Sequence, residues 1–281
     1  MDKILIIGCG DIGGALASQL HDEGHQVTGL KRSLQLDSPD ISFIQADITK
    51  PEELSNLSFD FDQVIYILSP SDRSISGYDA VFKIGVDNVL NWFKGQKENV
   101  AFTFVSSSRV YGQNKGEWLD ESSITEPTDE RGKILLEAEN TFLGFNSQTT
   151  IVRFSGIYGR SNYFINQLRK GADIQKEPAY YTNRIHRADC IGALSFIINK
   201  KSDGSAMTGV YLATDDDPAS KWDVACYLAD VYSLEQPAAL TLNKEADCNK
   251  RLTNNHLKAA GYQFKYKSYK QGYQEVIDEG A

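Results

Sequence analysis

Short apolar runs alternate with amphipathic stretches along the first half of the chain. Residues 4–7 are all apolar and end at a glycine, and residues 15–20 continue at helical spacing. Further strands are predicted at 41–44, 64–68, 101–105 and 150–154, and helices at 78–93 and 132–143. Because strands that alternate with crossover helices pair in parallel, this pattern predicts an α/β fold with a Rossmann-type, doubly wound parallel sheet.

The first apolar run ends in a glycine-rich turn at residues 8–13, which leads directly into the first helix. In such a turn, Gly8 allows a sharp exit from the strand, Gly10 makes room for a pyrophosphate, and Gly13 lets the helix pack close to the sheet. The free N–H groups and the positive dipole end of the helix then face the phosphates. The context predicts a dinucleotide site formed by Gly8, Gly10, Asp11, Ile12 and Gly13; the alternative is an ordinary glycine turn.

The end of the second predicted strand favours one of the two nicotinamide dinucleotides. A site specific for NAD(H) places a carboxylate there, on the hydroxyls of the adenosine ribose. This chain has Lys31 and Arg32 instead, two cations suited to a 2′-phosphate. We therefore expect NADP(H) rather than NAD(H); the alternative is that both side chains belong to a solvated loop.

Composition narrows the classes of protein. A chain of 281 residues with 41% hydrophobic content can bury a large core, and a net charge of −9 without a basic stripe argues against nucleic acid as a partner. No apolar run reaches the roughly 18 residues that span a bilayer, so we expect a cytoplasmic protein with no membrane partner. The cysteines form no C-x-x-C pair, which favours free thiols over disulfides or a metal site.

The alternation of strands and helices loosens after residue 155 into a stretch rich in tyrosine and glycine. Further helices are predicted at 188–199, 221–231 and 254–260. We predict a dinucleotide-binding Rossmann domain at 1–155, completed by about 184–212, and a smaller C-terminal substrate-binding lobe at 156–183 and 213–281.

Four further segments resemble successive signatures of the extended short-chain dehydrogenases/reductases: QADIT at 45–49, FVSSSRVYG at 104–112, IVRFSGIYG at 151–159 and RIHRAD at 184–189. Together with the glycine turn they cover most of the chain in the family's order. The resemblance implies a member of the NAD(P)-dependent epimerase/dehydratase set, many of which act on nucleotide sugars.

The same resemblance assigns roles to five residues. It implies that Asp47 and Ile48 flank the adenine and that Leu68 borders the cofactor at the fourth strand. It places Ser106 beside the nicotinamide and Ser107 at the position of the catalytic Ser/Thr. For each serine the alternative is a hydroxyl that closes a strand-end turn.

One helix start departs from the family pattern. Family members carry Tyr-x-x-x-Lys there, with the lysine one turn from the tyrosine, where it lowers a phenol pKa that is normally about 10. This chain has RGKILLEAE at 131–139, so Arg131 replaces the tyrosine and Leu135 replaces the lysine. A guanidinium cannot act as a base at neutral pH. We therefore expect Arg131 to bind the cofactor ribose, the phosphates or an anionic substrate group. Phe82 stands where the family often has asparagine.

Two functions follow from these residues. The first is an NADP(H)-dependent oxidoreductase or epimerase, in which Ser107 orients a carbonyl or hydroxyl of a small polar substrate such as a nucleotide sugar, with an unidentified acid/base. The second is a non-catalytic NAD(P)-binding redox sensor or regulator. The family's use of the 132–143 helix in dimers gives an expectation of a homodimer.

Overall fold

A seven-stranded sheet has the strand order β12-β7-β5-β4-β1-β2-β3. The pairings that join β3, β2, β1, β4 and β5 are all parallel. This arrangement confirms the predicted Rossmann-type, doubly wound α/β sheet. The strands are β1 (Lys3–Ile7), β2 (Gln26–Lys31), β3 (Ser42–Gln45), β4 (Gln63–Tyr66), β5 (Ala101–Ser107), β7 (Thr150–Phe154) and β12 (Gly209–Ala213).

The strand order reverses beside β1. From β1 the chain adds β2 and β3 on one side, and it then returns to place β4 and β5 on the other side. In open α/β sheets, ligands bind outside the carboxyl ends of the strands at such a reversal. The turn that follows β1 is therefore where a ligand site is expected.

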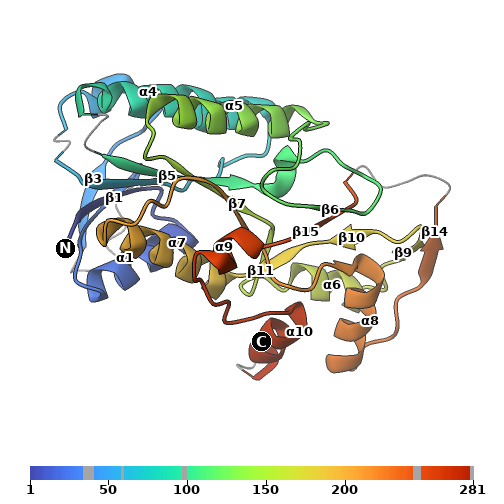
Figure 1. Cartoon of the computed structure of the whole chain (residues 1–281). Coiled ribbons are helices and arrows are strands. Elements are labelled where there is room, and N and C mark those ends of the chain that lie inside the picture. Colours follow the sequence, from blue (N-terminus) through green and yellow to red (C-terminus); the bar gives the residue numbers. More distant parts are fainter. Residues whose placement is uncertain (34–40, 58–59, 97–99, 243–247, 279–281) are drawn as a thin grey trace. The chain divides into compact units, whose positions relative to one another are not determined.

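Helices cover both faces of this sheet. Figure 1 shows α1 (Asp11–Asp22) and α7 (Arg187–Ser202) on one face and α4 (Gly85–Trp92) and α5 (Glu130–Phe145) on the other. The rings of Phe104 on β5 and Phe142 on α5 stack with centroids 4.9 Å apart. The apolar spacing of these segments thus reflects a buried aromatic layer. Shorter elements are α2 (Pro51–Leu54), α3 (Ile75–Asp79), η1 (Ala80–Ile84), η2 (Lys94–Gln96) and η3 (Ser108–Val110).

This computed structural model describes all residues except 34–40, 58–59, 97–99, 243–247 and 279–281. The chain divides into two compact units. The first contains Met1–Val110, Pro127–Arg153 and Ile191–Tyr211, and the second contains Tyr111–Glu126, Phe154–Cys190 and Leu212–Ala281. Residues 111–126 and 184–190 thus group with the second unit, which differs from the predicted boundaries. Within the described residues, every helix is too short or too polar to cross a bilayer.

The second unit is built from short strand pairs and a helical core. Its strands pair as β10 with β13, β11 with β8, β14 with β9 and β15 with β6. Its core includes Tyr158, Leu168 and Leu228. The strands are β6 (Glu117–Leu119), β8 (Gly156–Tyr158), β9 (Ile174–Glu177), β10 (Tyr181–Thr182), β11 (Arg184–His186), β13 (Ala219–Ser220), β14 (Ala239–Thr241) and β15 (Lys250–Leu252), and the helices are α6 (Tyr163–Arg169), α8 (Lys221–Val231), α9 (Asn255–Ala259) and α10 (Tyr269–Asp278).

A buried carboxyl in the second unit gives a pH-dependent prediction. Asp215 has 1% of its surface exposed, and burial raises its pKa to about 8 although the charge of Arg184 acts to lower it. The folded chain therefore holds a proton that the unfolded chain, with a pKa of about 3.9, releases. Between pH 5 and 8 the free energy of unfolding should fall with rising pH, by up to about 1.4 kcal/mol per pH unit from this group.

Urea unfolding of Asp215→Asn between pH 5 and 8 checks this slope. The variant keeps the side-chain oxygen that accepts the Asp217 N–H at 3.2 Å but does not titrate, so its stability should depend less on pH than that of the wild type. The exposed Asp203→Asn serves as the control. Parallel pH profiles for wild type and Asp215→Asn would contradict the prediction.

Candidate functional site

In the glycine turn after β1, neighbouring backbone atoms leave no room for a side chain at Gly8 or Gly13. Gly8 has a φ of +107°, and a Cβ on it would lie 2.0 Å from the carbonyl oxygen of Ile67. A Cβ on Gly13, in the first turn of α1, would lie 2.1 Å from the carbonyl oxygen of Gly8. Both positions therefore require glycine for the strand, the turn and the helix to pack against each other.

The same turn is open at Gly10. A Cβ placed on Gly10 would meet no atom within 4 Å, and the residue is exposed. Gly10 is also the N-cap of α1, where no side chain caps the helix. Asp11 and Ile12 begin that helix, and the side chain of Leu68 borders the turn, with Cδ2 2.7 Å from the position of a Gly8 Cβ. The turn thus offers backbone and the positive end of a helix dipole to an anion.

Lys31 and Arg32 at the end of β2 have different surroundings. The Nζ atom of Lys31 lies 4.5 Å from the centre of the Phe43 ring on the neighbouring strand β3. Arg32 is exposed, and its backbone oxygen accepts a hydrogen bond from Gln45 at 3.1 Å. Of these two cations, Arg32 is the one more open to a phosphate from solvent.

Asp47 and Ile48 follow β3. The Asp47 carboxylate accepts hydrogen bonds from the N–H of Thr49 at 3.0 Å and from its hydroxyl at 2.8 Å. Although partial burial acts to raise it, these bonds and nearby cations hold the pKa of Asp47 below its usual value. Ile48 is buried, with Cδ1 2.4 Å from where a Gly85 Cβ would lie. Its side chain packs against α4, and a contact of this segment with adenine stays a prediction.

Ser106, at the end of β5, belongs to a buried polar cluster. Its hydroxyl donates to Oε1 of Glu139 on α5 at 2.5 Å. Arg153 on β7 donates to the same carboxylate, from Nη2 to Oε2 at 2.6 Å and from Nε to Oε1 at 3.0 Å. All three side chains are buried. A contact between Ser106 and a cofactor would therefore have to use its backbone.

Ser107, the next residue, is half-buried. Its Oγ accepts the N–H of Arg109 at 3.2 Å, which closes the turn into η3. A serine hydroxyl that accepts one bond still has its own proton to donate. The geometry is therefore compatible with both interpretations of Ser107, the turn hydroxyl and the group that orients a carbonyl.

The start of α5 has no lysine beneath Arg131. Leu135, one turn further on, is 4% exposed and is packed in the core. Lys133 is exposed and lies 3.4 Å from Glu130, away from that buried face. Phe82 is likewise buried, in η1, where its ring lies 6.2 Å from that of Phe104. Leu135 and Phe82 are thus part of the apolar packing.

Arg131 is held by three partners. Its Nη1 donates to the backbone oxygen of Arg73 at 3.2 Å, its Nε lies 3.9 Å from Oδ1 of Asp129, and its Cζ lies 5.9 Å from the centre of the Tyr78 ring. Its side chain is 34% exposed. The guanidinium is thus fixed in place and still reachable from solvent.

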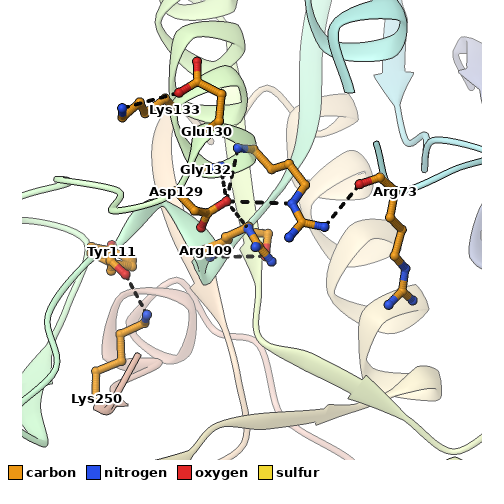
Figure 2. Close-up of polar contacts among 10 residues, drawn as sticks. Arg73, Arg109, Tyr111, Asp129, Glu130, Gly132, Lys133 and Lys250 are labelled. Atoms are coloured by element: carbon orange, nitrogen blue, oxygen red, sulfur yellow. Dashed lines mark hydrogen bonds and ion pairs between the residues drawn. The ribbon is translucent and has the colours of Figure 1, made fainter. Parts of the chain in front are cut away.

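Asp129 and Arg109 complete this arrangement, as Figure 2 shows. Asp129 caps α5 by accepting the N–H groups of Arg131 and Gly132, and it accepts a third bond from Nε of Arg109 at 2.9 Å. Although partial burial acts to raise it, these bonds hold the pKa of Asp129 below its usual value. Neither residue belongs to the site residues predicted from the sequence. The preference for Asp at helix starts could have indicated Asp129.

Metal-ligating residues do not gather at this site. Across the described residues, no group of three or more His, Cys, Asp or Glu side chains could hold a metal ion. Within the described residues, the four cysteines, Cys9, Cys190, Cys226 and Cys248, form no disulfide. Burial raises the pKa of Cys9, beside the glycine turn, to about 11, so its thiol stays protonated at neutral pH.

These features define a Rossmann-type protein with a glycine turn at the switch point of its sheet. The chain belongs to the family of the RmlD substrate binding domain, whose profile matches residues 2–281. It resembles the NAD-dependent epimerases/dehydratases, which confirms the family suggested by the sequence signatures.

Individual relatives agree with this assignment. A solved structure from Methylobacillus flagellatus, assigned to the NAD-dependent epimerases/dehydratases, is 34% identical, covers 99% of this chain and 98% of its own, and has a TM-score of 0.82. Protein YeeZ of Escherichia coli K12 is 26% identical over 216 residues, which are 73% of this chain and 76% of YeeZ. The dTDP-glucose 4,6-dehydratase of Bacillus anthracis, solved with NAD, is 17% identical over 99% of this chain and 96% of its own, with a TM-score of 0.80, and shows a shared fold alone.

Proposed function

We infer that this chain binds a nicotinamide dinucleotide with the pyrophosphate over the turn at Gly10. The observation that supports this most directly is the contrast within the turn. Gly8 and Gly13 have no room for a Cβ, whereas Gly10 has nothing within 4 Å and lies at an uncapped helix start. Such a turn fits a pyrophosphate. Titration of the purified protein with NADPH and NADH, followed by nicotinamide fluorescence, tests this function, and no saturable signal with either would reject it.

The preferred dinucleotide is NADP(H). Arg32 is exposed at the end of β2, where a site specific for NAD(H) would have a carboxylate. Arg32→Ser is expected to weaken NADPH binding about tenfold and to change NADH binding by less than about twofold, since a charge-assisted bond to the 2′-phosphate would be lost.

The same fluorescence titration measures both dinucleotides. Lys31→Ser is the matched control: it also removes a cation, but one whose Nζ lies over Phe43, so we expect a smaller loss of NADPH affinity. A wild-type protein with equal affinity for NADPH and NADH would contradict the preference.

The chemistry of the site is altered relative to the family. A bound nicotinamide would supply hydride transfer. Ser107 could orient a carbonyl or hydroxyl of a small polar substrate, with a nucleotide sugar as the first class to test. A guanidinium group cannot exchange a proton as the family's tyrosine does, so Arg131 cannot take over that role. We therefore propose an atypical epimerase/dehydratase-like protein in which Arg131 binds the cofactor or the substrate and does not transfer a proton.

A second candidate is a dinucleotide-binding sensor without turnover. The buried Leu135 favours the sensor, because it stands where the family has the lysine of its Tyr-x-x-x-Lys motif. Incubation with a panel of nucleotide sugars and stoichiometric NADP(H) separates the two. Tight binding without hydride exchange supports the sensor, whereas exchange supports the enzyme. Exchange that persists in Ser107→Ala would remove the role proposed for Ser107.

A homodimer remains an expectation that sedimentation can test.

A further inference from the structure

Two arginines near the start of α5 share one carboxylate oxygen. The Nε atoms of Arg109 and Arg131 lie 2.9 and 3.9 Å from Oδ1 of Asp129, which also accepts the N–H groups of Arg131 and Gly132. One carboxylate cannot neutralise two guanidinium charges. The amino-terminal end of the 16-residue helix α5 adds partial positive charge at the same place. The local charge is therefore positive.

Both guanidinium groups keep donors for another partner. Arg131 uses Nη1 on the backbone oxygen of Arg73. Among the residues that the structure describes, neither Nη2 of Arg131 nor the two Nη atoms of Arg109 have an acceptor. The side chains of Arg109 and Arg131 are 35% and 34% exposed, so these donors are partly withdrawn from water but reachable. Donors in this state form strong charge-assisted bonds with oxyanions.

The positions of the two arginines are set by their surroundings. Asp129 engages both through Nε, which leaves Nη2 of Arg131 and both Nη atoms of Arg109 for a ligand, and the Tyr78 ring lies against the Arg131 guanidinium. Gly132 allows this close arrangement, because a Cβ there would lie 3.0 Å from the carbonyl oxygen of Arg109. The Arg109 N–H is bonded to Oγ of Ser107. The backbone of Arg109 is therefore next to the serine that would meet the substrate.

We propose that Arg109 and Arg131 form a subsite for an anionic group of the substrate, a carboxylate or a phosphate, beside Ser107. The inference rests on the proposed function, because it names the charge of the molecule on which that site would act. Asp129 is a positioning residue in this subsite. Arg131 stands where the family has a tyrosine that transfers a proton. In this chain the residue at that position binds the substrate instead.

Inorganic phosphate and malonate are suitable probes, and they distinguish a phosphate from a carboxylate. The protein, labelled with ¹⁵N-arginine, is titrated with each probe in the absence and in the presence of saturating NADP⁺, with chloride at matched ionic strength as the blank. We expect the Nε–H signals of Arg109 and Arg131 to shift saturably with at least one probe and not with chloride. The probe that binds more tightly identifies the class.

Variants show whether these side chains are responsible. Arg131→Gln and Arg109→Gln should each weaken binding of that probe about tenfold. The matched control is Lys133→Gln, which removes a positive charge from the same turn of α5 but at an exposed side chain near Glu130, so its effect should stay within about twofold. Thermal unfolding of each variant confirms that it is folded. An equal loss in Lys133→Gln would reduce the effect to general electrostatics and overturn the proposal.

NADPH affinity, measured on the same variants, separates this subsite from the dinucleotide site. We expect Arg131→Gln to retain NADPH affinity within about threefold. Equal losses of probe and NADPH affinity would make the arginines part of the dinucleotide site and overturn the inference, as would the absence of any Nε–H shift. If the wild type binds a probe here but no dinucleotide, the proposed function fails while the anion site is supported.

Discussion

Replacing Arg153 by methionine is expected to lower the free energy of unfolding by about 3–5 kcal/mol, because it leaves the carboxylate of Glu139 buried without a cation. The side chains of Glu139 and Arg153 are 1% and 6% exposed. Water therefore cannot reach the Glu139 carboxylate to replace the hydrogen bonds that Arg153 donates, and a buried charge without such bonds is unfavourable. Ser106 would retain one bond to the carboxylate. Urea unfolding measures the change.

Two further variants make this test specific. Glu139→Leu combined with Arg153→Met removes both charges and should recover most of the lost stability, because a buried ion pair is often no better than apolar packing of similar volume. Glu130→Gln, at the exposed Lys133–Glu130 pair on the same helix, should change stability by less than about 0.5 kcal/mol. A double variant as unstable as Arg153→Met would show that the cluster stabilises through something other than its charge balance.

The regular elements were predictable because their apolar residues face a buried sheet. The predicted helix at 221–231 coincides with α8, and the strand at 150–154 coincides with β7. The glycine turn was predictable for a related reason: its spacing is dictated by local backbone geometry, which Gly8 and Gly13 confirm. Both signals can be recognised within a short stretch of the sequence, although the atom that excludes a Cβ at Gly8 belongs to the distant residue Ile67.

Contacts between distant residues were not predictable in this way. Glu139 lies in a helix, where a charged side chain is expected to face solvent, and only the fold brings it to Arg153 and Ser106. Arg109 and Asp129 meet although 20 residues separate them. The pairing of β6 with β15 likewise joins residues 117–119 to 250–252, which explains why the segment 111–126 groups with the second unit.

The start of α5 shows how these limits bear on function. The sequence identified Arg131 and Leu135 as departures from the family pattern and predicted a binding role for Arg131, but it did not indicate which residues surround them. The structure adds that Leu135 is buried and that Arg131 lies beside a second guanidinium. The role proposed for Arg131 therefore depends on Arg109 and Asp129, which lie outside the motif that contains Arg131.

Replacing Gly10 by alanine is expected to weaken NADPH binding at least about thirtyfold, equivalent to about 2 kcal/mol, while the free energy of unfolding changes by less than about 1 kcal/mol. The added Cβ would meet no protein atom within 4 Å, and the φ of Gly10, −81°, is negative, so this position lacks the left-handed conformation that favours glycine. The methyl group would instead occupy the space proposed for the pyrophosphate.

Gly8→Ala is the matched contrast, because it adds the same methyl group two residues earlier. There the Cβ would lie 2.0 Å from the Ile67 oxygen at a φ of +107°, so the free energy of unfolding should fall by at least about 2 kcal/mol. Fluorescence titration and urea unfolding of both variants give the two quantities. If Gly10→Ala binds NADPH as tightly as the wild type, the phosphates do not lie over this turn. The separation of a binding loss at Gly10 from a stability loss at Gly8 would locate the ligand on the open side of the turn.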